Sequence, residues 1–438
     1  MKMKTPIFDF VKKYSDSDIS RFHMPGHKGV EYLGCESMDI TEIYGADSLY
    51  EADGIIRESE KNASKIFDTG DTFYSTEGSS LCIRAMIYAA LINTSKKPLI
   101  AAARNVHKSF VYTVAALDLD VCWIYPKNSN SLCSGSITAD EAERVLKEYE
   151  PFALYITSPN YIGQMSDIKE IARICKKYDT PLLVDNAHGA YLKFFDMHPI
   201  NLGAAMCCDS AHKTLPVLTG GAYLHISKEY NKIYSPCIKD AMSFFASTSP
   251  SYLTLCSLDL CNKTLTSNYD ELIQSTFHSV NELKEYIKSK NFELYGCEPL
   301  KITIHTNGNK MAERLRELGG ECEYSDDEFI VFMFTPQNTK KDFDLIKKLI
   351  SSCENYEPIN SPRIEKGEKA VSIRKALLSK QELVKTERAI GRICASPTVS
   401  CPPAVPIAVS GELITEKKAE LFKFYGIDKI SCVKTDKN

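Results

Sequence analysis

Short apolar runs that alternate with amphipathic stretches constrain the fold of this chain more than any other feature. The amphipathic stretches include ADEAERVLKEY and DIKEIARICKKYD, whose apolar residues recur at the spacing of one helix face. The apolar runs have the length of buried strands and lie at residues 98–103, 121–125, 152–157 and 182–184. Strand and helix units repeated at this length imply a mainly parallel sheet covered by helices on both faces. The sequence therefore predicts an α/β fold.

Local signals also predict where several helices lie. Residues 55–67 place Ile56, Ala63 and Ile66 on one side, which predicts a helix with one buried face. Thr138 stands three residues before Glu141, the spacing of a capping box at a helix start. Residues 1–20 predict a short amphipathic arm that packs either on the main body or on a second subunit.

The length of the chain predicts two domains, since single cores stop growing near about 250–300 residues and this chain has 438. We expect an N-terminal arm and loop at residues 1–45 and a large domain at 46–285. A smaller α/β domain is expected at 286–438, where LKITIHT, EFIVFMFT and KDFDLIKKLI predict strand, strand and helix.

The composition excludes several classes of protein. No apolar run approaches the roughly 20 residues of a membrane-spanning helix, and no secretory signal is evident, so we expect a cytoplasmic protein. The net charge of -4 comes with dispersed basic residues, which argues against a nucleic-acid partner but suits a small cationic substrate.

The cysteines and histidines show no metal-binding pattern. The 16 cysteines form no CxxC pair, and we expect them to be reduced, mostly buried small hydrophobes. His23 and His27 cannot share a helix face because Pro25 and Gly26 interrupt the segment between them. No metal site is therefore predicted.

Residues 180–215 hold the strongest candidate for chemistry. A buried run, LLV, ends on Asp185, and a second small-residue run leads to Ser210, His212 and Lys213. Ligands of open α/β sheets bind at the carboxyl ends of the strands. A lysine amine at such an end can form an imine with an aldehyde, and a carboxylate can keep a pyridine nitrogen protonated, which is what pyridoxal phosphate (PLP) requires.

These residues also resemble a known family. DNAHG followed by DSAHKTLPVLTGGAYLH is similar to the PLP site of the fold-type-I ornithine/lysine/arginine decarboxylases. RFHMPGHKG resembles the segment that opens the short members, which lack the N-terminal wing domain of larger members. The proline-rich CPPAVPIAVSGE resembles part of the C-terminal domain of the family. The resemblance extends from Arg21 to about Ile427 and implies an aspartate-aminotransferase-like fold.

The resemblance assigns expected roles around the PLP ring. Lys213 would hold the cofactor as a Schiff base, and Asp185 would contact the pyridine nitrogen. His107, in ARNVHKS after an apolar strand, would stack on the ring, and His188 would face the phenolic oxygen.

The phosphate of PLP is expected to bind at a helix start. Gly78, Ser79 and Ser80 follow a predicted strand, and the first N–H groups of a helix together with hydroxyls form an anion site. The residues that follow depart from the usual string of the family, and a serine there is also an ordinary N-cap. The resemblance adds Ser210 and His212 as further phosphate contacts.

The resemblance also implies a shared site and a cationic substrate. In related dimers a segment like STSPSYLT reaches the partner's active site, which makes Thr248 and Ser249 candidate cofactor contacts and predicts at least a homodimer. Asp47, in an acidic loop, and Glu412 are candidate contacts for the distal cation of the substrate, although a solvated loop carboxylate is an equal alternative for Glu412.

The predicted reaction is decarboxylation of arginine, lysine or ornithine to the corresponding polyamine-type amine and carbon dioxide. One alternative is another fold-type-I reaction, transamination or a lyase step, in which Arg374 or Arg392 would bind the α-carboxylate. The other is a non-catalytic PLP-binding paralogue. The sequence does not decide among the three amino acids, because the depth of a pocket and not a motif selects the length of a side chain.

Overall fold

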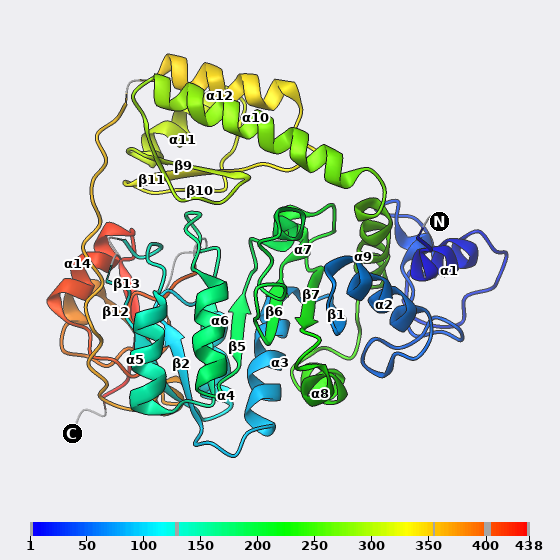
Figure 1. The fold of residues 1–438 in the computed structure, drawn as a ribbon, viewed down its shortest axis with the longest axis horizontal. Coiled ribbons are helices and arrows are strands. Elements are labelled where there is room, and N and C mark those ends of the chain that lie inside the picture. Colours follow the sequence, from blue (N-terminus) through cyan, green and yellow to red (C-terminus); the bar gives the residue numbers. More distant parts are fainter. Residues whose placement is uncertain (1–2, 128–130, 354, 398–403, 436–438) are drawn as a thin grey trace. The chain divides into compact units, whose positions relative to one another are not determined.

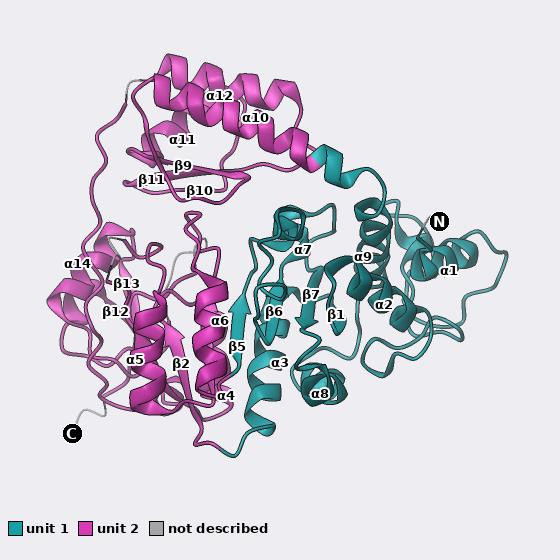
Figure 2. Ribbon diagram, viewed as in Figure 1, with its two compact units in different colours: residues 1–95, 181–272 teal, residues 96–180, 273–438 magenta. Residues whose placement is uncertain are grey.

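The computed structural model describes residues 3–127, 131–353, 355–397 and 404–435. The chain forms two compact units, and each is built from two separate stretches of sequence (Figure 2). Unit 1 comprises residues 1–95 and 181–272, and unit 2 comprises residues 96–180 and 273–438. The three-part division at residues 45 and 285 stays a prediction.

In the described part of unit 1, four strands lie in the order β1 (Asp71–Ser75), β7 (Ala222–Ile226), β6 (Met206–Asp209) and β5 (Leu182–Asp185). β5 and β6 are parallel, whereas β7 is antiparallel to both of its neighbours. Every residue of β5 and β6 is buried, which explains why both strands are apolar without alternation until their last residue. Because the two strands are parallel, Asp185 and Asp209 end at the same edge of the sheet.

Helices cover this sheet within unit 1 (Figure 1). The helix α3 (Gly78–Ile92) packs against β6 and β7, and α8 (Asn231–Ser243) packs against α3. α2 (Ile55–Phe67) has the bounds predicted from its apolar spacing and packs on β1. α1 (Pro6–Ser15) packs on α2 and on α9 (Tyr252–Leu265). The short helices η1 (Glu36–Met38), η2 (Leu49–Glu51), η3 (Ala190–Phe195) and α7 (Ala211–Thr214) complete this unit.

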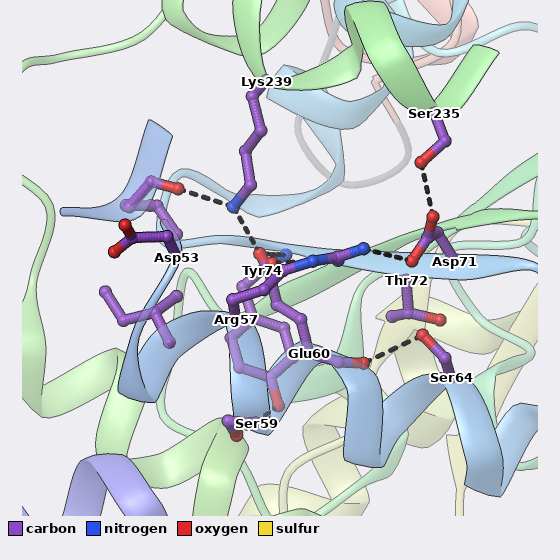
Figure 3. A network of polar contacts seen from close by, with 12 residues as sticks. Asp53, Arg57, Ser59, Glu60, Ser64, Asp71, Thr72, Tyr74, Ser235 and Lys239 are labelled. Carbon is purple, nitrogen blue, oxygen red and sulfur yellow. Dashed lines mark hydrogen bonds and ion pairs between the residues drawn. The ribbon is translucent and has the colours of Figure 1, made fainter. Parts of the chain in front are cut away.

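A polar network fixes α2 to its neighbours in unit 1 (Figure 3). The side chain of Glu60 is buried, and its carboxylate forms an ion pair with Lys239 of α8. Arg57, one turn earlier on α2, forms an ion pair with Asp71 of β1. A buried carboxylate needs such partners, because an uncompensated charge in an apolar interior is costly.

Among the described residues of unit 2, three parallel strands lie in the order β4 (Ala153–Thr157), β2 (Leu99–Ala103) and β3 (Asp120–Ile124). The helices of this part are α4 (Lys108–Ala116), α5 (Ala139–Tyr149) and α6 (Ile168–Lys177). The predicted capping box is present at α5: the Thr138 hydroxyl accepts the N–H of Glu141, and the Glu141 carboxylate accepts the N–H of Thr138.

The rest of unit 2 is a separate α/β layer followed by the C-terminal segment. An antiparallel sheet has the order β10 (Tyr324–Ser325), β11 (Phe329–Met333), β9 (Lys301–His305) and β8 (Glu293–Tyr295). Its helices are α10 (Tyr269–Ser289, which begins in unit 1), α11 (Gly308–Glu317) and α12 (Lys340–Ser352). The C-terminal segment contains α13 (Ile373–Leu377), β12 (Gln381–Lys385), η4 (Thr386–Arg388), α14 (Glu416–Phe424) and β13 (Lys429–Val433).

The predicted α/β class with a large, mainly parallel sheet is confirmed. The cysteines that the structure describes form no disulfides, and most of them are buried. Among the described residues, no helix combines the length and the apolar composition that a bilayer crossing requires. The cytoplasmic location stays a prediction.

Candidate active site

The candidate active site of unit 1 lies where β5 and β6 end. Asp185 is the last residue of β5, and Asp209 is the last residue of β6. The chain then turns through Ser210 into the single turn of α7, which contains His212 and Lys213. Residue 185 pairs with residue 208 in the sheet, so the segments that hold the predicted acid and amine are immediate neighbours.

The amine of Lys213 lies beside a histidine. Its Nζ is 3.1 Å from Nε2 of His188, which comes from the loop after β5. A hydrogen bond of this length allows a proton to pass between an amine and an imidazole. The structure therefore brings together Lys213 and His188, two of the residues predicted to be catalytic.

Asp185 is buried, and the adjacent backbone holds its carboxylate. Oδ1 accepts the backbone N–H of Ala187 at 3.2 Å, and the side chain is 2% exposed. The thiol of Cys208, on the neighbouring strand, lies 3.7 Å from the same oxygen. Burial raises the pKa of the Cys208 thiol well above its usual range, so this group stays a neutral neighbour of the carboxylate.

The predicted phosphate-binding residues lie on two segments that meet in unit 1. The hydroxyl of Ser210 donates to the hydroxyl of Ser79 at 2.7 Å, which joins the start of α7 to the first turn of α3. Gly78 has a positive φ of 69°, and a side chain at this position would meet nothing within 4 Å. The first turn of α3 thus combines open space, backbone N–H groups and hydroxyls, the features of an anion site.

The segment before β7 supports both of these turns. The N–H of Gly78 donates to the carbonyl of Gly220 at 2.7 Å, and His212 donates from its backbone N–H to the carbonyl of Gly221 at 3.2 Å. Nδ1 of His212 lies 3.1 Å from the same Gly221 carbonyl. The ring of His212 is therefore oriented by the backbone of the segment before β7.

A buried polar cluster behind the site was not indicated by the sequence. Oδ2 of Asp209 lies 3.0 Å from Nε2 of His198 and 3.2 Å from Nε2 of His225, and all three side chains are fully buried. Oδ1 accepts a hydrogen bond from Asn186 at 2.7 Å. Burial acts to raise the pKa of Asp209, but the charge attraction and hydrogen bonds of the two histidines outweigh burial and hold this pKa well below its usual range.

His107 belongs to unit 2 and caps α4. Its Nδ1 accepts the backbone N–H of Ser109 at 3.1 Å, and its side chain is partly exposed. Its predicted stacking on the cofactor stays a prediction.

Thr248 and Ser249 lie in the exposed loop between α8 and α9. The carboxylate of Glu77, which precedes α3, accepts the N–H of Ser247 in this loop at 2.8 Å. The role of Thr248 and Ser249 in a partner's site stays a prediction.

The two candidate substrate carboxylates both have partners within their own units. Asp47 accepts backbone N–H groups from Gly54 at 3.0 Å and from Ile56 at 2.9 Å, and thereby holds the loop before α2. Glu412 is 6% exposed and lies 2.9 Å from Nζ of Lys418. A substrate cation would have to compete with these contacts, and the predicted roles of both residues stay predictions.

The comparisons with known proteins cover most of the chain. The family model described as the major domain of Orn/Lys/Arg decarboxylases matches residues 5–352. An arginine decarboxylase of Bacillus subtilis (strain 168) is 28% identical over an alignment that covers 94% of this chain and 92% of the relative. An arginine decarboxylase of Halalkalibacterium halodurans is 29% identical, with coverages of 94% and 91%.

Solved structures share the fold. The crystal structure of a lysine decarboxylase from Francisella novicida matches with a TM-score of 0.80 at 18% identity, covering 98% of this chain and 81% of that chain. A NifS-like protein matches with a TM-score of 0.56 at 13% identity, covering 80% of this chain and 96% of that chain. These matches confirm the predicted fold type. Because the family model covers well over half of the chain, this protein belongs to the Orn/Lys/Arg decarboxylase family, as its motifs predicted.

Proposed function

We propose that this protein is a PLP-dependent decarboxylase of a basic amino acid, and that arginine is the first substrate to test. The observation that carries the proposal is the amine of Lys213, held 3.1 Å from His188 where two parallel strands end. The relatives reported above support arginine, because both are named arginine decarboxylases.

The residues of unit 1 fit the PLP group. Lys213 would hold its aldehyde carbon, Asp185 would contact its pyridine nitrogen, and the first turn of α3 with Ser210 would hold its phosphate. The open space at Gly78 and the contact between Ser79 and Ser210 support this assignment. When bound, PLP supplies an aromatic ring that accepts the electron pair left on the α-carbon by the departing carbon dioxide.

The protein side chains then have defined tasks. The buried carboxylate of Asp185 would favour the protonated form of the pyridine nitrogen, because an opposite charge stabilises the charged form of a neighbour. His188 lies within hydrogen-bonding distance of Lys213, so the pair can hold the proton that the α-carbon receives after decarboxylation. The formal net charge of -4 is compatible with a cationic substrate.

Transamination needs a cation for the α-carboxylate of the substrate, and both candidate arginines have other partners. Arg374 donates to the carbonyl groups of Ala115 and Ala116, at 3.0 and 2.9 Å. Arg392 donates to the Glu382 carboxylate at 2.6 Å and to the Val433 carbonyl at 2.9 Å. These contacts favour decarboxylation over transamination.

Side-by-side assays with arginine, lysine and ornithine test the proposal. We expect release of carbon dioxide together with agmatine, cadaverine or putrescine, at the highest kcat/KM for one of the three. A keto acid as the main product would replace the proposal with transamination. Absence of both products, with no visible absorption band after PLP is added, would refute it.

A further inference from the structure

The carboxylate of Asp209 connects the two strand ends that bear the proposed active-site residues. Asp209 is the last residue of β6, is fully buried and directly precedes Ser210. Its Oδ1 accepts a hydrogen bond from Nδ2 of Asn186 at 2.7 Å, and Asn186 directly follows Asp185 at the end of β5. The carboxylate of Asp209 thus contacts Asn186, the residue after Asp185. Asp209 itself precedes Lys213 by four residues in the sequence.

Backbone hydrogen bonds and a close approach of Gly189 fix the position of Asn186 at the end of β5. Its backbone N–H donates to the carbonyl of Cys208 at 3.0 Å, and its own carbonyl accepts the N–H of Gly189 at 2.8 Å. A Cβ at position 189 would lie 2.1 Å from Oδ1 of Asn186, so only glycine leaves room for this side chain. The backbone around Asp185 therefore has little freedom as long as Asn186 keeps its contact with Asp209.

The two histidines hold the other carboxylate oxygen of Asp209. Across the sheet, residue 225 pairs with residue 72 on one side and with residue 207 on the other. Nδ1 of His225 lies 2.8 Å from the hydroxyl of Thr72, whose proton it can accept if Nε2 donates to Asp209. Nδ1 of His198 is buried with no hydrogen-bond partner among the described residues, so Nε2, 3.0 Å from Asp209, is the ring atom that bonds to the carboxylate.

Each histidine then donates from Nε2 to the carboxylate of Asp209, which is ionised because its pKa is held well below the usual range. Hydrogen bonds to an ionised carboxylate are roughly twice as strong as those between neutral groups. Asp209 accepts three of them from three separate segments of unit 1, which makes its position strongly determined.

We propose that Asp209 is a positioning residue, which through Asn186 and the two histidines holds the ends of β5 and β6 in a fixed relation. The inference rests on the proposed roles of Asp185 and Lys213. The cluster matters for the reaction because it keeps the carboxylate of Asp185 at a fixed position relative to the amine of Lys213. A misplacement of about 1 Å in a reacting geometry can cost on the order of a hundredfold in rate.

A bound metal ion is the competing explanation for the same side chains. Ligand atoms of His198, Cys207 and Asp209 lie within 4.8 Å of one another. Burial raises the pKa of the Cys207 thiol well above its usual range, whereas zinc binds a thiolate. Direct hydrogen bonds already join Asp209 to both histidines, so a hydrogen-bonded cluster accounts for the geometry.

The test compares Asp209→Asn with Asp259→Asn. Asn has the size of Asp but only one acceptor oxygen, so its N–H group would face a donor on one side of the cluster, either the two histidines or Asn186. Asp259 is the matched control: it is a fully buried carboxylate of unit 1 whose hydrogen bonds go to Ile7, Phe8 and Ser59. Hydrogen–deuterium exchange of the apo protein, the Kd for PLP, and kcat and KM of the loaded enzyme are measured for both variants.

For Asp209→Asn we expect faster exchange in residues 182–190 and 206–215 and a PLP Kd raised about tenfold. We expect kcat to fall by about 10–100-fold with KM changed less than about threefold, because geometry and not substrate binding is lost. Asp259→Asn should leave the exchange of these two segments, the PLP Kd and kcat at their wild-type values.

Several outcomes would overturn the inference. A folded Asp209→Asn protein with wild-type exchange at both strand ends and wild-type PLP affinity would do so. So would a stoichiometric metal ion in the purified protein that His198→Ala removes. If Asp209→Asn does not fold, Asn186→Ala cuts the link to β5 while leaving both histidine contacts, and unchanged exchange at residues 182–190 would be the negative result. Should wild-type protein fail to bind PLP, the proposed function fails, whereas the exchange experiment still tests Asp209.

Discussion

Substitution of Asp185 should lower turnover while most of the cofactor binding is retained. Replacing Asp185 with Ala removes the carboxylate proposed to contact the pyridine nitrogen but leaves Lys213 and the first turn of α3 in place. We therefore expect much of the PLP to stay bound while kcat falls at least a hundredfold, which corresponds to about 2.7 kcal/mol. Steady-state kinetics and PLP absorbance measure the two effects.

The control for this substitution is Asp196→Ala, which removes an exposed carboxylate of the same unit. It should leave both PLP content and kcat unchanged. An Asp185→Ala protein with a rate close to that of the wild type would exclude the proposed role.

Gly220 should be needed for the phosphate-binding turn. Its φ is 95°, and a Cβ here would lie 2.7 Å from the backbone oxygen of Thr76. Gly220→Ala should therefore displace the carbonyl that accepts the N–H of Gly78 and weaken PLP binding, while pyridoxal, which lacks the phosphate, binds as before. Absorbance titrations with the two compounds measure this difference.

Gly319→Ala is the matched control for Gly220→Ala, because it places alanine in a similar positive-φ backbone conformation. Its φ is 87°, but nothing lies within 4 Å of the added Cβ. Alanine in this conformation costs about 1–2 kcal/mol of stability. We expect Gly319→Ala to lose that stability without any change in PLP affinity, and an equal loss of affinity in both variants would contradict the proposed role of Gly220.

Single residues differed in how well the sequence predicted them. The position of Asp185 at a strand end, and that of Lys213 in the turn after the next strand, could be predicted because each apolar run and the polar residues that follow it are adjacent in the chain. The partners of Asp209 could not, because His198 and His225 come from other segments and no local spacing relates them. Buried polar clusters of this kind become visible only when sheet register is known.

At the scale of elements, the attachment of α1 should depend on pH through Asp259 of α9. Oδ2 of Asp259 accepts the N–H groups of Ile7 and Phe8 in the first turn of α1, at 2.9 and 3.0 Å. Burial raises the pKa of Asp259 from 3.8 to about 6, although the hydrogen bonds from Ser59, Phe8 and Ile7 act to lower it.

The sign of the effect follows from proton binding. Between pH 4 and 6 the folded protein binds more protons at Asp259 than the unfolded chain does, so this group makes folding less favourable as pH rises through that window. We expect its contribution to the free energy of unfolding to fall by about 1–2 kcal/mol between pH 5 and pH 7. Asp259→Asn should remove that part of the pH dependence, as measured by urea unfolding at both pH values. Identical pH profiles for the variant and the wild type would contradict the raised pKa.

Elements with local end signals were predicted well. The helix at residues 55–67 and the capping box at Thr138 have the predicted positions, because their signals lie within a few residues of each other. The attachment of α1 to α9 could not be predicted, since the contact between Asp259 and Ile7 joins residues 252 positions apart.

At the scale of the whole molecule, the sequence predicted the fold class, whereas the packing of distant stretches is visible only in the structure. Alternating strands and helices indicated a mainly parallel sheet, and the structure has one. Each compact unit, however, is built from two stretches that are separated in the sequence. Composition and periodicity describe neighbours along the chain, and they contain no information on which distant stretches pack together.

Removing PLP should change the stability of the protein as a whole and the protection of unit 1 in particular. A ligand that binds only the folded state stabilises it by about 2.7 kcal/mol when its concentration is a hundred times its Kd. The proposed contacts are Lys213, Asp185, Ser79 and Ser210, and all of them lie in unit 1. We therefore expect the apo protein, prepared with hydroxylamine, to unfold at lower urea concentration and to exchange faster at residues 75–82, 182–190 and 206–222.

Re-addition of PLP to the apo protein should restore both properties, and pyridoxal should restore less protection at residues 75–82 because it lacks the phosphate. The control is the antiparallel sheet of unit 2, whose β9 at Lys301–His305 should exchange equally with and without PLP. The segment around His107 is a separate readout, since protection there on PLP binding is the result that its predicted stacking requires. Equal protection of both units from exchange would mean that PLP acts only through the global stability of the protein. That result would contradict the proposed assignment of its contacts to the ends of β5 and β6.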